Sequence, residues 1–113
     1  MGNSGCALLL AGAVGGAGTA VWLSDKLTQA VNAPFDKTVL AVKSALAELD
    51  LHIIREIQKD DVAQVISEYY AGQKVWVDIH KMTQKSSRVE VRVGLTGDEE
   101  AARKILDQIL ASL

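Results

Sequence analysis

Apolar positions recur at helical spacing in two segments of the chain. After Asn32-Ala33-Pro34, the spacings of four, three, four and three place one apolar series on a single helix face: Phe35, Val39, Val42, Leu46 and Leu49. Pro34 suits the first position of a helix, where the missing N–H has no partner to lose. The pattern therefore predicts a helix over residues 34–49.

The second helical segment ends the chain. Its apolar face comprises Ala102, Ile105, Leu106, Ile109, Leu110 and Leu113. Thr96 and Glu99 have the spacing of a capping box, and the acids at 98–100 suit the positive end of a helix dipole. We expect a helix over residues 98–112.

Between the two helices, alternating or β-branched runs predict four short strands. The runs lie within residues 51–59, 62–70, 75–80 and 89–95. In the second run one parity holds Val62, Ile66 and Tyr70, which we expect to form its more apolar side. Turns are expected at Asp60-Asp61, Ala71-Gly72 and residues 83–87.

The last predicted hairpin suggests a register. A turn centred on Lys85 would place Ile79 opposite Val91 and, on the other face, Asp78 opposite Arg92 and His80 opposite Glu90. Each opposed charge pair would contribute roughly 0.2–1 kcal/mol. This register matches apolar with apolar residues and opposite charges with each other.

Residues 19–31 mix apolar and polar positions and predict one further strand, although Asp25 and Lys26 interrupt the alternation. The order is then strand, helix, four strands, helix. Such an order predicts an α+β fold, with an antiparallel sheet of four to five strands and two helices packed on one face.

The first 24 residues contain no Asp, Glu, Lys or Arg and hold six of the nine glycines. We therefore divide the chain into a Gly/Ala-rich anchor and spacer segment at 1–18 and a single α+β domain at 19–113. Three interpretations of the uncharged segment compete. A spanning helix is marginal because glycine weakens helix propensity and transfer into lipid. A complete signal peptide would need a basic start, which residues 1–5 lack.

The third interpretation makes Ser4-Gly5-Cys6 the end of a lipoprotein signal, because small residues before a Cys are what lipoprotein processing accepts. Cys6 would then be the lipid attachment site. The alternative for Cys6 is a lone thiol with no function.

Composition excludes several function classes. Twelve basic and 14 acidic residues give a net charge of −2, which does not favour nucleic-acid binding. One cysteine allows neither an internal disulfide nor a zinc site of several thiolates. The two histidines, His52 and His80, lie in no catalytic or metal-binding spacing, and no phosphate-binding loop follows a strand. We expect no enzymatic activity, no catalytic residues, no metal and no cofactor.

Three stretches resemble a known family. These are Ser-Gly-Cys before the Ala/Gly-rich run, Asn-Ala-Pro-Phe-Asp-Lys at 32–37, and the most specific part, residues 92–106. They are similar to an uncharacterised family of short bacterial envelope lipoproteins, a domain of unknown function. The order of elements also resembles, more remotely, the helix-grip domains of a lipoprotein subunit of the β-barrel assembly machinery.

The resemblance implies a lipid on Cys6, a membrane anchor and a periplasm-facing location. Ala7 after the Cys, where inner-membrane retention commonly uses Asp, favours the outer membrane. We expect a non-enzymatic structural or protein-interaction module with an envelope protein as partner, and Tyr69 and Trp76 on an otherwise polar strand face as contact residues. The alternative is a lipid or small apolar-ligand binding module, whose groove between the first helix and the sheet would be lined by Phe35, Val39, Val77 and Val91.

Overall fold

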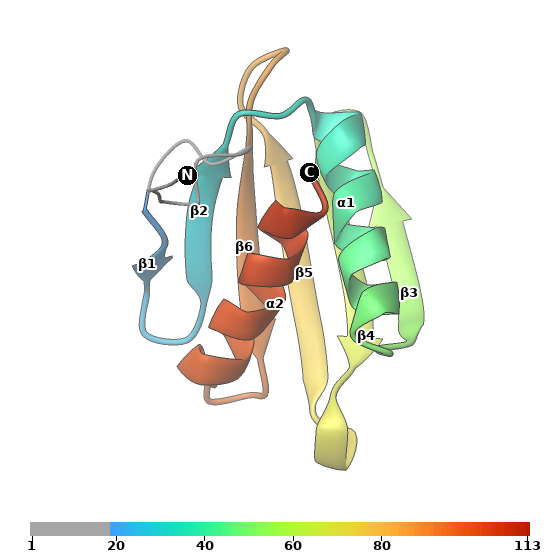
Figure 1. Cartoon of the computed structure of the whole chain (residues 1–113), viewed down its shortest axis with the longest axis vertical. Helices are drawn as coiled ribbons and strands as arrows, with labels where there is room; N and C mark the ends of the chain where they lie inside the picture. Colours follow the sequence, from blue (N-terminus) through green and yellow to red (C-terminus); the bar gives the residue numbers. More distant parts are fainter. Residues whose placement is uncertain (1–18) are drawn as a thin grey trace, which may run out of the picture.

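Residues 19–113 form a six-stranded antiparallel sheet, and two helices of the same range cover one of its faces (Figure 1). The computed structural model describes residues 19–113. The elements are β1 (Val21–Trp22), β2 (Leu27–Val31), α1 (Phe35–Glu48), β3 (Ile53–Gln58), β4 (Val62–Glu68), the short 3₁₀ turn η3 (Tyr70–Gly72), β5 (Lys74–Lys81), β6 (Ser87–Val93) and α2 (Glu99–Ala111). The α+β class and both predicted helices are confirmed.

The strand order is β1-β2-β6-β5-β4-β3, and every neighbouring pair is antiparallel. The first hairpin therefore lies beside the last strand of the chain, and β3 forms the opposite edge. Both helices lie on the same side of the sheet in Figure 1. We call this side the helix-covered face and the other side the open face.

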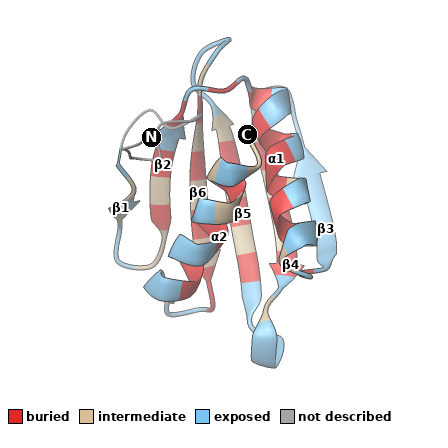
Figure 2. Cartoon of the chain, in the orientation of Figure 1, coloured by how far each residue is buried: buried red, intermediate tan, exposed pale blue. Residues whose placement is uncertain are grey.

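The core lies between the helices and the inward side chains of the central strands (Figure 2). The predicted apolar face of α1 is buried from Phe35 to Leu46, and Leu49 is half-buried at the helix end. Val91 and Val93 of β6 are fully buried, as their alternation predicts. One cluster joins α1, α2 and four strands, so the two helices and the sheet share a single core.

The prediction of one strand over residues 19–31 is wrong. Two strands form there, because the chain turns between Leu23 and Lys26, where the Leu23 N–H donates to the Lys26 carbonyl at 2.7 Å. Ser24 takes a left-handed conformation in this turn, with φ of 69°. The interruption of alternation at Asp25 and Lys26 therefore marks a turn, and the sheet of residues 19–113 has six strands.

The predicted register of the β5–β6 hairpin is displaced by two residues. The turn centres on Gln84, so Ile79 pairs with Val89, and Asp78 stands opposite Glu90. A shift of two residues keeps every side chain on its predicted face and changes only its cross-strand partner. Both registers bury valines equally well, and backbone hydrogen bonds from Met82 and Thr83 to Ser86 close the shorter turn.

Two smaller predictions are also wrong. In β4 the inward side chains are Ala63, Val65 and Ser67, while Val62 and Ile66 lie on the open face. The N-cap of α2 is Asp98, whose carboxylate accepts from the Ala101 N–H at 3.1 Å, and not Thr96. Asp98 has the same capping chemistry and lies directly before the first helical residue.

Candidate functional site

The open face of the sheet carries the polar side chains of the central strands. These are Gln64 on β4, Trp76, Asp78 and His80 on β5, and Arg88, Glu90 and Arg92 on β6, all of them half-buried. They lie on this face because the alternate residues of the same strands are committed to the core. A row of charged and aromatic groups therefore lies on a rigid sheet.

Glu90 is the centre of the charges on this face. Its carboxylate lies 3.5 Å from Lys26 Nζ, 3.6 Å from His80 Nε2 and 3.4 Å from Arg88 Nε. The Glu90 side chain is only 12% exposed, which weakens the screening of these contacts by water. The cluster therefore connects the β1–β2 turn with β5 and β6.

Asp78 faces a second carboxylate, that of Glu90, across the β5–β6 pair. The side-chain amide of Gln64 donates a hydrogen bond of 2.8 Å to the Asp78 carboxylate. Like charges directly opposite each other in a sheet are destabilising. Asp78 is thus held on the open face at a cost to stability, which is common in functional sites.

Trp76 and Arg92 form the other contact of the open face. The guanidinium carbon of Arg92 lies 5.0 Å from the centre of the Trp76 ring, and its Nη2 donates to the Leu95 carbonyl at 2.7 Å. Arg92 also approaches Asp25 at 3.9 Å. One arginine therefore connects the tryptophan, the loop after β6 and the β1–β2 turn.

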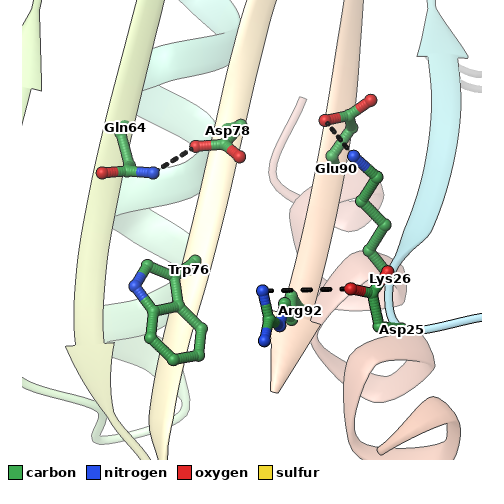
Figure 3. Close-up of a pocket in the computed structure, with 7 residues that line it drawn as sticks. All are labelled: Asp25, Lys26, Gln64, Trp76, Asp78, Glu90 and Arg92. Carbon is green, nitrogen blue, oxygen red and sulfur yellow. Dashed lines mark hydrogen bonds and ion pairs between the residues drawn. The ribbon is translucent and has the colours of Figure 1, made fainter. Parts of the chain in front are cut away.

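Two hollows lie on either side of Trp76 and share its side chain as lining. The first, the polar hollow, has a volume of about 260 Å³ and is lined by Asp25, Lys26, Gln64, Trp76, Asp78, Glu90 and Arg92 (Figure 3). The second, the loop hollow, has a volume of about 470 Å³ and is lined by Ala71, Gly72, Gln73, Lys74, Trp76, Gly94, Leu95 and Thr96. Trp76 is the wall that the two hollows share.

An exposed leucine lies at the rim of the loop hollow. Leu95 is 79% exposed, the highest value among the large apolar side chains of residues 19–113. Burying such a side chain in a partner would be favourable by roughly 25 cal/mol for each Å² of apolar area. Since Arg92 fixes the Leu95 backbone, this rim is held in place before any partner arrives.

The predicted contact residues do not share a face. Trp76 lies on the open face, as expected, whereas Tyr69 is half-buried against the core on the helix-covered face, with its ring 4.6 Å from that of Tyr70. β4 ends at Glu68, and Tyr69, two residues after the buried Ser67, points to the same side as Ser67. Cys6, the predicted lipid attachment site, lies outside the described residues.

Sequence reasoning missed Arg92 and Leu95 as part of this site. In the sequence Arg92 is one charged residue in an alternating strand, and Leu95 continues that alternation as an apolar residue. Gly94 could have indicated that Leu95 is not a core residue. It has a φ of 75°, and β6 ends at the residue before it.

The groove proposed for an apolar ligand is filled by side chains. Phe35 and Val39 of α1 are 5% and 3% exposed, and Val77 and Val91 of the sheet are fully buried. These residues belong to one packed cluster. A ligand there would have to separate α1 from the sheet.

The two histidines of the chain lie at opposite ends of the sheet. His80 lies at the β3–β4 turn end of the sheet, opposite Val62, and His52 lies at the other end, where its carbonyl accepts from Ser67 Oγ. Within residues 19–113 no group of three His, Cys, Asp or Glu side chains is placed to hold a metal ion. None of the helices in this range has the length and apolar character to cross a membrane.

The structure therefore defines a small α+β domain whose open face carries charged side chains and Trp76. The chain belongs to the family described as Protein of unknown function (DUF3568), whose model matches residues 1–112. A comparison with the curated proteins finds no match for this chain. The expected membership of a family of unknown function is confirmed.

Proposed function

We propose that the protein is a non-enzymatic, lipid-tethered module of the bacterial envelope that acts by binding another protein through its open face. The observation that carries the proposal is the arrangement around Trp76, where an aromatic wall between two hollows, an arginine and an exposed leucine come together. Tryptophan and arginine are enriched in the residues that dominate protein interfaces.

The tether rests on the sequence. Cys6 follows two small residues in a segment without charges, and the similarity to envelope lipoproteins includes this stretch. Two or three acyl chains on such a cysteine anchor a protein stably, so no membrane-spanning helix is required. The tether would place the domain at the periplasmic side of a membrane, with the outer membrane favoured by Ala7.

The remote resemblance to helix-grip domains stays part of the proposal, and one feature supports it, namely two helices on one face of an antiparallel sheet. Fold similarity does not transmit a function, so the interaction role depends on the site alone.

Photocrosslinking at the loop hollow tests the interaction role. We would place p-benzoylphenylalanine at Leu95 and, as a matched control, at Leu40, which is 62% exposed on α1. We expect a discrete crosslinked product in native membranes from position 95 and none from position 40, and loss of that product in Trp76→Ala. Equal products from both positions, or none from position 95, would refute the role of the open face.

Mass spectrometry and fractionation test the tether. The protein, expressed with a complete lipoprotein signal, should yield an acylated peptide that begins at Cys6. The Cys6→Ser variant should move from the membrane to the soluble periplasmic fraction, because acylation requires the thiol. Unchanged membrane retention of Cys6→Ser would show that the uncharged segment itself is the anchor.

A further inference from the structure

Within residues 19–113, β3 forms an outer edge of the sheet and carries exposed apolar side chains. Among residues 19–113 it pairs with β4 and with no other strand. All six of its residues are exposed, and Ile53, Ile54 and Ile57 are 39%, 52% and 36% exposed. A long exposed edge of this kind is a template for pairing with another strand.

The backbone groups of this edge can be assigned from the hairpin. The Lys59 N–H donates to the Val62 carbonyl at 2.8 Å across the Asp60-Asp61 turn. Because bonded and non-bonded pairs alternate in an antiparallel ladder, Glu56 and Gln58 direct their N–H and C=O groups away from β4. These groups are available to an added strand.

The charged side chains of β3 and Lys59 differ between the two faces of the sheet, with basic residues on the open face and Glu56 on the helix-covered face. On the open face Arg55 and Ile57 stand opposite Ile66 and Gln64, and continued pairing places Lys59 opposite Val62. Neither Arg55 nor Lys59 has an ion-pair partner within the described part of the chain. On the helix-covered face Glu56 is already paired with Lys43 at 3.1 Å.

A third hollow lies beside the beginning of β3. It has a volume of about 340 Å³ and is lined by Lys43, Ala47, Asp50, Leu51, His52 and Ile53, between the last turns of α1 and the strand. In strand addition, main-chain hydrogen bonds supply affinity and pockets for alternate side chains supply specificity. The hollow can take an apolar side chain that an added strand directs to the helix-covered face.

We propose that the outer edge of β3 binds an extended acidic segment of a partner protein as an additional strand. Its open-face side chains would alternate acid, apolar, acid against Arg55, Ile57 and Lys59. A second copy does not fit, because antiparallel β3–β3 registers set these basic residues against each other or against isoleucine. Residues 1–24 supply no acid at all. The surface is separate from the Trp76 site and does not depend on the tether.

Two synthetic peptides with blocked ends test the proposal against the ¹⁵N-labelled full-length chain in a mild detergent. The first, Thr-Glu-Val-Val-Thr-Glu-Thr, carries the predicted pattern, and the second replaces both glutamates by lysine. We expect saturable shifts and slowed hydrogen exchange at the amides of Glu56 and Gln58 with the acidic peptide, and at least tenfold weaker binding of the basic one. Equal binding of both, or unchanged amides at millimolar peptide, would overturn the proposal.

Variants separate charge from backbone recognition. Arg55→Glu should abolish the preference between the two peptides, because Lys59 still favours an acid where the new carboxylate at position 55 would favour a base. Lys104→Glu, on the exposed side of α2, should leave the preference unchanged. Gln58→Pro removes an outward N–H and should weaken binding at least fivefold. Trp76→Ala should bind the acidic peptide normally, which distinguishes this edge from the open-face role. A concentration-dependent dimer protected at Glu56 and Gln58 would instead identify a second copy as the occupant.

Discussion

The guanidinium of Arg92 lies over the Trp76 ring, with 5.0 Å between its central carbon and the ring centre, and holds the Leu95 carbonyl at 2.7 Å. Arg92 therefore contacts both Trp76, which is the wall of the loop hollow, and Leu95, which lies at its rim. Arg92 is 35% exposed, so its pairing with Asp25 at 3.9 Å adds little to stability.

The first prediction concerns Arg92→Gln. We expect a loss of unfolding free energy of about 0.5–1 kcal/mol, the size of a partly exposed cation–π contact. Trp76 emission should shift to longer wavelength because its ring becomes more exposed to water. Urea denaturation and fluorescence of the variant in a Trp22→Phe background measure both effects. An unchanged spectrum would mean that Arg92 does not cover the ring.

The second prediction uses the two opposed carboxylates. Asp78→Asn keeps an acceptor for the Gln64 amide and removes one like charge, so it should raise the free energy of unfolding by about 0.2–1 kcal/mol. Glu90→Gln should lower it, because Lys26, His80 and Arg88 lose their shared partner. The urea midpoints of the two variants should therefore move in opposite directions. Destabilisation by both would show that Asp78 contributes to the ion network.

The third prediction concerns the contact between the β6–α2 loop and the first turn. Gly97 has a φ of 82°, and a Cβ there would lie 2.6 Å from Asp25 Cα and 2.7 Å from its carbonyl oxygen. Gly72 has a similar φ of 77° but open space around it. Gly72→Ala should lose about 1 kcal/mol from backbone strain alone, and Gly97→Ala should lose more. Equal losses would show that the two loops separate easily.

Hydrophobic periodicity predicts the helices and the inward valines because burial alone decides those positions. It cannot fix the partners of residues on the open face, since a register shift of two leaves every face unchanged, as for Asp78 and Glu90. The sequence does not predict the turn at Ser24, because a positive φ is usually signalled by glycine and here a serine adopts it. The contact from Arg92 to Leu95 depends on a backbone carbonyl in a loop, which residue types do not specify.

The fourth prediction tests whether the space between α1 and the sheet is closed. Leu46 is fully buried there, so Leu46→Ala should cost about 2–5 kcal/mol. Leu40→Ala, at an exposed position of the same helix, should change stability by no more than about 0.5 kcal/mol. Adding a fatty acid should leave the urea midpoint of the unmodified protein unchanged. A raised midpoint with ligand would instead support the apolar-ligand alternative.

The fifth prediction is that deletion of residues 1–18 leaves a cooperatively folded domain. All six strands, both helices and the buried cluster described above lie within residues 19–113, and the packing of α1 and α2 on the sheet uses side chains of this range. The removed segment carries no charge that could pair with the domain. Urea denaturation of the full and shortened chains in the same detergent, followed by the fluorescence of Trp22 and Trp76, should give the same midpoint and the same slope. Loss of the cooperative transition on deletion would mean that residues 1–18 complete the core, and the division of the chain at residue 18 would then be wrong.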